Sequence, residues 1–164
     1  MRRLYLVAAL TWGLDIATKI WAVNNLSARN PVELLGSFFQ LTLVRNPGAA
    51  FSFATGATIV FTCIAVAAVI AILYYSSKIT SLGWANTLGL LLGGVLGNLT
   101  DRLFRSPGFL KGEVIDWLEL THWPVFNLAD SAIVVAAFLA IVLTIRNVGP
   151  VNVAQEFWSG KQWT

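Results

Sequence analysis

The side chains of this chain that could do chemistry are four aspartates, which have amide or cationic residues close by in the sequence. They make up half of the eight acidic residues. Two carboxylates close enough to share a proton cannot both ionise, so one can act as a base towards water and the other as an acid towards a carbonyl group. A pair of aspartates is therefore the simplest catalytic group for hydrolysis that the sequence offers. The four are Asp15, Asp101, Asp116 and Asp130.

Most of these aspartates also have a purely structural explanation. Asp15 and Lys19 are spaced i,i+4 on one helical face, where a simple ion pair explains them about as well as catalysis does. Asp101 stands beside Arg102, and we predict a second ion pair there. Asp130 falls in the first turns of a predicted helix, where an acid interacts favourably with the helix dipole.

Most other hydrolytic mechanisms need residues that the sequence does not contain. His122 and Cys63 are the only residues of their types, which excludes a disulfide framework, a His/Cys zinc cluster and a Cys-x-x-Cys site. His122 is also the only base for a Ser-His triad, and Cys63 lies in the middle of a predicted helix. A Ser-Lys dyad stays open, because Ser52, Ser131 and Lys19 all fall near the predicted polar end.

Composition places the chain in a membrane. Of its 164 residues 57% are hydrophobic and only 12% are charged, with a mean hydropathy of +0.71, which is far more apolar than a soluble domain. The net charge is +3, but the eleven Lys and Arg form no basic stripe, so we expect no nucleic acid partner. Arg2 and Arg3 before an apolar run resemble a signal peptide, yet no small-x-small cleavage site follows, which favours a retained anchor.

Four apolar stretches are close to the ~20 residues that span hydrocarbon, so we predict an all-α membrane protein with four transmembrane helices in one domain, 1–164. Residues 39–43 alternate apolar and polar side chains, which predicts a strand in a small extramembrane sheet, and Asn46 to Gly48 predict a turn. A surface loop or short helix is expected after the third helix. The predicted helices are 4–23, 57–75, 82–99 and 125–145, and the extramembrane segments are 24–56 and 105–124.

Glycines at every fourth position mark one predicted helix. Gly89, Gly93 and Gly97 have the small-xxx-small spacing that lets two membrane helices approach closely. Helix packing is the default explanation of this repeat.

Because successive helices cross the membrane in alternating directions, we predict by parity that the polar residues lie at one end of the bundle. The exits of the first and third helices and the entries of the second and fourth must lie on one side of the membrane. Buried ionisable groups at membrane depth cost roughly 2.5–3.5 kcal/mol each, so several together need partners or a function. Lys and Arg divide evenly between the two sides, but Arg2 and Arg3 adjoin the first helix, so we expect both termini to be cytoplasmic.

Five short motifs occur in order between Asp15 and Asp130. Together they resemble the conserved boxes of the lipoprotein signal peptidase (signal peptidase II) family. They are DIATK from Asp15, NPGAAF from Asn46, GGVLGNLTDR from Gly93, VIDW from Val114 and FNLAD from Phe126. The resemblance implies an aspartic endopeptidase of the bacterial inner membrane. Such an enzyme removes signal peptides from diacylglyceryl-modified prolipoproteins, cutting before the lipidated cysteine, and needs no metal or organic cofactor.

Transferred motif by motif, the resemblance makes Asp116 and Asp130 the catalytic pair, near the outer surface. It implies lipidated prolipoprotein and membrane lipid as partners, and we expect a monomer. Trp117 stands where the family usually has Phe, and the segment from Arg102 to Val114 is longer than usual, which affects loop geometry and not the pair. The implied supporting residues are Asn46, Asn98, Arg102, Asn127, Asp15, Lys19, Asp101 and Gly48.

Three other classes fit the sequence less well. A small transporter needs acids near the membrane midplane, and only Asp15 approaches that depth. A scaffold protein explains the glycine repeat but not acids gathered on one side. A presenilin-type protease needs a Gly-x-Gly-Asp signature, which the sequence lacks.

Overall fold

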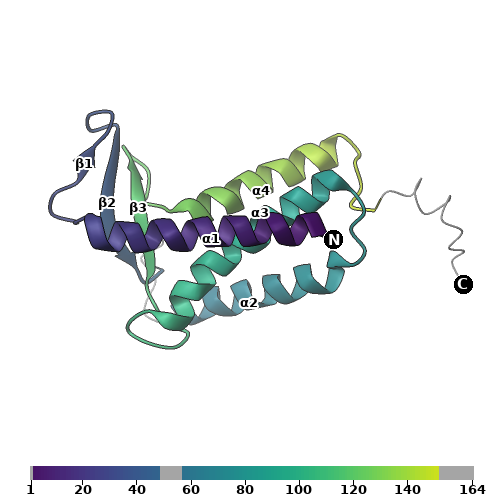
Figure 1. Ribbon diagram of the computed structural model, residues 1–164, viewed down its shortest axis with the longest axis horizontal. Coiled ribbons are helices and arrows are strands. Elements are labelled where there is room, and N and C mark those ends of the chain that lie inside the picture. Colours follow the sequence, from purple (N-terminus) through teal and green to yellow (C-terminus); the bar gives the residue numbers. More distant parts are fainter. Residues whose placement is uncertain (1, 49–56, 152–164) are drawn as a thin grey trace, which may run out of the picture.

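The computed structural model describes residues 2–48 and 57–151 and arranges them as a helix bundle with a small sheet at one end (Figure 1). Part of the predicted NPGAAF motif, Ser52 and the C-terminal tail lie outside the described residues. The elements follow the order α1 (Arg2–Asn25), β1 (Val32–Glu33), β2 (Phe39–Asn46), α2 (Ala57–Ser76), α3 (Leu82–Phe104), β3 (Val114–Leu120) and α4 (Leu128–Ile145).

All four helices of the described residues are long and apolar enough to cross a membrane, as predicted. The two largest differences from the predicted boundaries are at the end of α3 and at the start of α4. α3 continues to Phe104, five residues past its predicted end, because Asp101 is paired inside the protein and does not need to leave the helix for water. α4 begins at Leu128 and not at 125, because the side chain of Asn127 caps its first turn.

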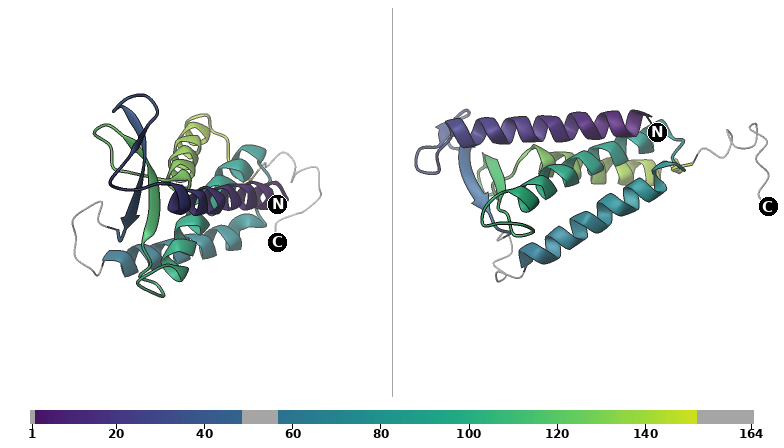
Figure 2. Two further views of the ribbon diagram at one scale, coloured as in Figure 1. Left: turned by 60° about the vertical axis from the view of Figure 1, so that its left-hand side comes forward. Right: turned by 60° about the horizontal axis from the view of Figure 1, so that its bottom comes forward.

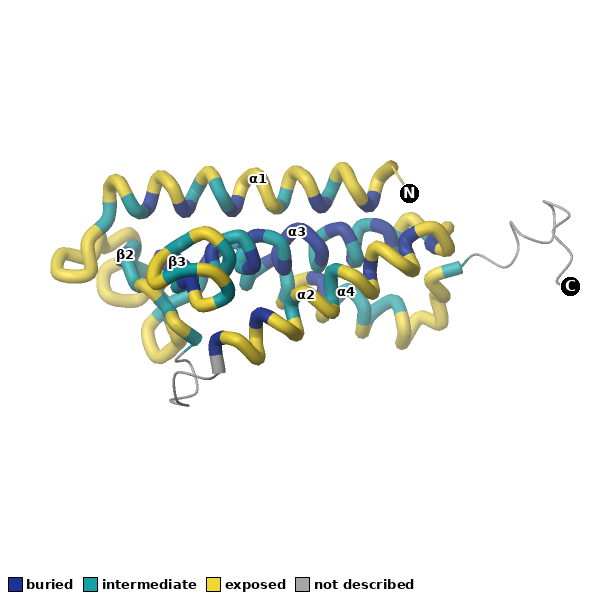
Figure 3. The backbone as a smooth tube through the Cα atoms, turned by 90° about the horizontal axis from the view of Figure 1, so that it is seen from below, coloured by how far each residue is buried: buried dark blue, intermediate teal, exposed yellow. Residues whose placement is uncertain are grey.

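α3 is the central helix and contacts the other three, and its backbone is the most buried part of the molecule (Figure 3). The predicted glycine repeat makes this packing possible. A Cβ atom at Gly93 would lie 2.6 Å from the backbone oxygen of Ala8 in α1, and one at Gly94 would lie 2.6 Å from the backbone oxygen of Ala129 in α4. Two neighbouring glycines therefore bring α1 and α4 against adjacent faces of one helix.

α2 packs mainly against α3 and diverges from α1 towards the end that carries the sheet (Figure 2). Most of its surface is exposed in the isolated chain, and the exposed residues are apolar. A helix of this length with an apolar surface fits a membrane-spanning segment.

The described strands form one antiparallel sheet in the order β1-β2-β3. Alternation correctly predicted a strand at 39–43, but the sequence analysis expected a loop or short helix where β3 lies. Val114 to Trp117 are all buried, so β3 has no apolar–polar alternation that would reveal it. β2 pairs with β3 from Phe39 opposite Leu120 to Asn46 opposite Val114, with an irregularity between Leu41 and Val44.

Candidate active site

Five elements meet where the sheet joins the bundle: α1, β2, α3, β3 and α4. This convergence brings together the four aspartates that the sequence analysis singled out. Three of them, Asp15, Asp101 and Asp116, are at most 1% exposed, and Asp130 is half-buried. The parity argument is therefore confirmed, since residues far apart in the sequence lie in one hydrogen-bonded cluster.

Asp116 lies on β3 and accepts a hydrogen bond at each carboxylate oxygen. Asn46 Nδ2 donates to Oδ2 at 2.8 Å, and Asn127 Nδ2 donates to Oδ1 at 2.6 Å. Burial raises the pKa of Asp116 to about 6, and the nearby carboxylate of Asp130 raises it further, against the opposing hydrogen bonds and the charge of Lys19. Asp116 is thus a carboxyl group that changes its protonation close to neutral pH.

Both amides that contact Asp116 are themselves held in place. Asn46 ends β2, and its Oδ1 accepts from the backbone N–H of Gly48 at 2.8 Å, which fixes the turn that the sequence predicted. Asn127 is fully buried, and its Oδ1 accepts from the backbone N–H of Asp130 at 2.9 Å. Because each amide oxygen is occupied, each NH2 group must point at Asp116.

Asp130 occupies the first turn of α4. Its Oδ1 accepts from Asn98 Nδ2 at 2.7 Å, and its Oδ2 accepts from the backbone N–H of Asn127 at 3.2 Å, which completes a capping box. The N-terminus of α4 adds the favourable field of its backbone amides. The site therefore supports a negative charge on Asp130.

A backbone bridge joins the two segments that carry these carboxylates. Leu118 of β3 pairs with Phe126 just before α4, through hydrogen bonds of 2.8 and 2.9 Å. Asn127 then links the segments by its side chain, because it donates to Asp116 and accepts from the backbone of Asp130. The backbone bridge and the Asn127 side chain together hold the segments that carry the two carboxylates side by side.

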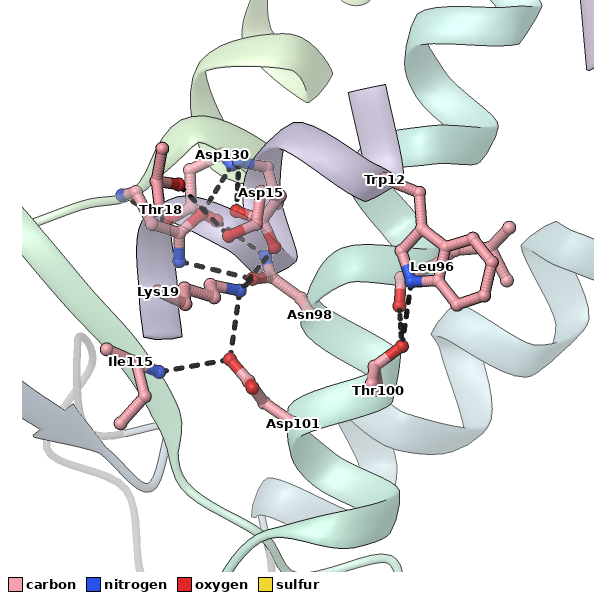
Figure 4. Close-up of polar contacts among 12 residues, drawn as sticks. Trp12, Asp15, Thr18, Lys19, Leu96, Asn98, Thr100, Asp101, Ile115 and Asp130 are labelled. Atoms are coloured by element: carbon pink, nitrogen blue, oxygen red, sulfur yellow. Dashed lines mark hydrogen bonds and ion pairs between the residues drawn. The ribbon is translucent and has the colours of Figure 1, made fainter. Parts of the chain in front are cut away.

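Lys19 reaches the same cluster from α1 and is completely buried (Figure 4). Its Nζ lies 2.8 Å from Asp15 Oδ2 and 2.9 Å from Asp101 Oδ2, and it donates to Asn98 Oδ1 at 3.0 Å. The ammonium group thus has one acceptor for each of its three protons. The predicted Asp15–Lys19 ion pair is present, but it is part of a larger network.

The network extends to the backbone on both sides of the aspartates. Asp15 Oδ1 accepts from the N–H of Ala129 at 2.9 Å, next to Asp130 in α4. Asp101 Oδ2 accepts from the N–H of Ile115 at 3.2 Å, next to Asp116 in β3. These two side chains therefore set the positions of the segments that carry Asp116 and Asp130.

The predicted ion pair between Asp101 and Arg102 is wrong. Asp101 pairs with Lys19 and with Arg105, whose Nε contacts Asp101 Oδ1. Adjacent residues of a helix point about 100° apart, whereas residues four apart share a face. Arg105 is not among the predicted site residues, although its i,i+4 spacing from Asp101 is a signal that identifies such a partner.

Arg102 instead faces the carboxylates. Its guanidinium interacts electrostatically with three carboxylates, most strongly with Asp116, less with Asp130 and least with Asp101. Its Nη1 is buried and has no hydrogen-bond partner among the described residues. Arg102 thus keeps a free donor beside the cluster.

The Ser-Lys alternative is not supported by the described residues. Lys19 Nζ is paired with the carboxylates of Asp15 and Asp101, so it is not available to a serine as a base. The hydroxyl of Ser131 donates to the backbone oxygen of Asn127 at 3.0 Å. Ser52 lies outside the described residues. Within those residues, no group of three His, Cys, Asp or Glu side chains could hold a metal ion.

The fold and the site define a class: a multi-pass membrane protein with a cluster of buried carboxylates at one end of its helix bundle. Residues 7–146 match the family described as "Signal peptidase (SPase) II", so the chain belongs to the signal peptidase II family. This confirms the predicted family and function, a membrane peptidase that cleaves the signal peptides of prolipoproteins.

Relatives and solved structures agree. A lipoprotein signal peptidase of Rhodococcus jostii is 48% identical over 90% of this chain and 74% of its own length, and one of Mycobacterium avium is 49% identical over 88% and 80%. Two solved structures, each titled as a bacterial membrane enzyme, share the fold. One has a TM-score of 0.77 at 28% identity over 88% of this chain and 93% of its own, and the other has 0.78 at 25% over 100% and 96%.

Proposed function

We propose that Asp116 and Asp130 are the catalytic pair with which this peptidase cleaves lipidated prolipoproteins before the modified cysteine. The observation that carries the proposal is the double role of Asn127, which donates to Asp116 and is bonded to Asp130 in a capping box. No other pair of described carboxylates combines close linkage with a carboxyl that titrates near neutrality.

The environments of the pair suggest a division of roles. Asp116 is buried and has a raised pKa, so it holds the shared proton and donates it to the carbonyl oxygen of the scissile bond. Asp130, at the start of α4, stays a carboxylate and takes a proton from the attacking water. Water oxygen bonds to the carbonyl carbon, which gives a tetrahedral diol intermediate. As the C–N bond breaks, the amine takes the proton held by Asp130, and one hydroxyl of the diol returns its proton to Asp116, so both carboxyls regain their starting states.

Arg102 would bind substrate in this proposal. Its Nη1 is a buried donor with no partner among the described residues, beside the two carboxylates. A backbone carbonyl of the signal peptide would satisfy this donor. Such a bond would hold the peptide in reach of the pair, which is the kind of positioning that lowers the entropic part of a barrier.

The lipid on the substrate determines the direction from which the peptide enters the site. A diacylglyceryl group attached next to the scissile bond must stay in hydrocarbon, so the peptide reaches the site sideways from the membrane. We infer a bacterial inner-membrane enzyme that acts as a monomer, with both termini cytoplasmic and the sheet end at the outer surface. Exposed apolar residues of the β1–β2 hairpin, such as Leu35 and Phe38, support contact of the sheet with that surface.

The test is single-turnover cleavage of a lipidated prolipoprotein by purified protein. Asp116→Asn and Asp130→Asn should each abolish cleavage while the folded variant still binds the substrate. Asparagine keeps the shape of each side chain but cannot share the proton. Wild-type turnover in either variant would refute the pair.

A further inference from the structure

The charges at the sheet end of the bundle form one network and not separate pairs. Its negative members are four carboxylates and its positive members are three side-chain cations. Asn98 connects the two halves, because its oxygen accepts from Lys19 at 3.0 Å and its NH2 group donates to Asp130 at 2.7 Å. The members are Asp15, Asp101, Asp116, Asp130, Lys19, Arg102 and Arg105.

The elements around this network carry few other charged side chains. β2 contributes the neutral Asn46 and one charged side chain, Arg45, which is exposed, and α2 carries no charged side chain. α4 carries no charge besides Asp130, and residues 49–56 contain no ionisable side chain by sequence. Of the remaining nearby charges, Glu119 lies three residues beyond Asp116 on β3, and Lys111 and Glu113 lie in the loop before β3, where Lys111 is exposed.

Because the network is buried, its net charge strongly affects the protonation of its members. Lys19, Asp15, Asp101 and Asp116 are all at most 1% exposed, so water screens their mutual interactions weakly. Three cations against four carboxylates leave one negative charge in excess. The network is neutral when the carboxylates together hold one proton.

We propose that Lys19, Asp15 and Asp101 set the protonation state of the Asp116–Asp130 pair by charge balance, so that the network is neutral with one proton on the pair. These three are positioning residues, because the hydrogen bonds and ion pairs that they make with described residues do not include Asp116 or Asp130 themselves. The inference rests on the proposed function, because it concerns the same pair. The position of the Asp116 pKa near 6 agrees with a single proton that is exchanged near neutral pH.

The proposal predicts opposite effects from opposite charge changes. Lys19→Met leaves the network one charge more negative, so the pair keeps its protons to higher pH and the bell-shaped pH–rate profile moves up by about one pH unit. Asp15→Asn leaves it more positive and moves the profile down by a similar amount. The double variant Asp15→Asn/Lys19→Met restores the charge and returns the profile to that of the wild type.

A purely structural role gives a different result. Loss of an ion pair lowers the amount of folded protein and the rate at every pH, but it leaves the pH optimum where it was. Lys111→Met is the matched control, because it removes the same charge from an exposed position near the site and should leave the profile unchanged. Arg105→Met removes a cation from the partly exposed edge of the network and keeps Lys19, so it should shift the profile upward even if Lys19→Met does not fold.

The experiment is single-turnover cleavage of a lipidated prolipoprotein between about pH 5 and pH 9, normalised to folded protein, for these five variants. Shifts in opposite directions that cancel in the double variant support charge balance. Shifts in one direction, or lower rates with an unmoved optimum, overturn it. Failure of the proposed catalytic pair is distinguishable, because it appears as turnover by Asp116→Asn or Asp130→Asn and not in these profiles.

Discussion

Asn127 and Asp130 hold each other by two reciprocal hydrogen bonds. The side chain of each accepts from the backbone N–H of the other, at 2.9 and 3.2 Å. A candidate catalytic carboxylate is therefore also part of a helix cap. Its remaining oxygen accepts from Asn98, so the cap fixes the direction in which that carboxylate points.

Asn127→Asp separates the two roles of this asparagine. The new carboxylate still accepts from the backbone N–H of Asp130, so the start of α4 keeps its cap. It cannot donate to Asp116, and it places a further negative charge beside the pair. We expect folded protein with turnover lowered at least about a hundredfold, by analogy with the loss of one preorganised donor.

Asn127→Ala is the comparison, since it removes both the cap and the donor. Its melting temperature should fall by the equivalent of about 1 kcal/mol relative to Asn127→Asp. Thermal unfolding and single-turnover rates of the two variants measure this. Full activity in Asn127→Asp would show that the hydrogen bond to Asp116 is dispensable.

The raised pKa of Asp116 predicts a pH-dependent contribution to stability. An acid whose pKa is about 6 in the folded protein and 3.8 when unfolded binds its proton more tightly in the folded state. Folding stability from this group is therefore lost as pH rises from about 4 to about 6, by on the order of 2–3 kcal/mol. The stability of Asp116→Asn relative to wild type should rise over that range and level off above it.

Chemical or thermal unfolding of both proteins at several pH values gives this difference. Only its slope with pH is diagnostic, because asparagine also changes the hydrogen bonds with Asn46 and Asn127. A difference that is flat between pH 4 and pH 7 would contradict a raised pKa.

Gly93→Ala should destabilise the bundle. The added Cβ would lie 2.6 Å from the oxygen of Ala8, and backbone atoms cannot move aside without separating α1 from α3. Gly13→Ala is the matched control, because a Cβ at Gly13 meets no atom within 4 Å and alanine favours the helix. Melting temperatures in one detergent should fall for Gly93→Ala and hold or rise for Gly13→Ala; equal effects would refute close packing at Gly93.

A prolipoprotein without its diacylglyceryl group should be a very poor substrate. Binding energy from the acyl chains positions the distant carbonyl, so its loss lowers the rate of the chemical step as well as the affinity. Parallel single-turnover assays of lipidated and unlipidated precursors measure this. Comparable turnover of the two would contradict sideways entry from the membrane.

Cysteine labelling in intact cells tests the proposed topology. In a Cys63→Ala background, cysteines introduced at Arg29 and Lys111 should react with a membrane-impermeant reagent, and one at Lys78 should be protected. The first two lie at the sheet end and the third in the turn between α2 and α3. Labelling at 78 with protection at 29 and 111 would reverse the orientation.

The sequence predicted the helices because hydrocarbon imposes a length and a composition that need no tertiary information. It also predicted the end of the bundle at which Asp15, Asp101, Asp116 and Asp130 meet, because parity alone places them there. Partners could not be predicted in the same way. Asp101 pairs with Arg105 and Lys19 and not with its neighbour Arg102, because side-chain direction and the contact between helices decide which cations lie close to it.

β3 shows a second limit of sequence analysis. A strand that is covered on both faces loses the alternation that identifies strands, and its apolar run at Val114 and Ile115 then looks like any buried segment. Only pairing with β2 and with Phe126 defines it. Asp116, on this strand, was placed near the other aspartates by parity, and its catalytic role was implied only by the family resemblance and not by its local pattern.

The bond from Asp15 to the backbone of Ala129 has a consequence for how the protein is made. α1 leaves the ribosome with Asp15 and Lys19 one turn apart, so the helix can enter the bilayer with its two charges already neutralised by each other. α4 emerges about a hundred residues later, and only then does Asp15 find its second partner. Since the proposed catalytic pair includes Asp130 of α4, the proposal implies that the chain gains activity only after α4 has been made.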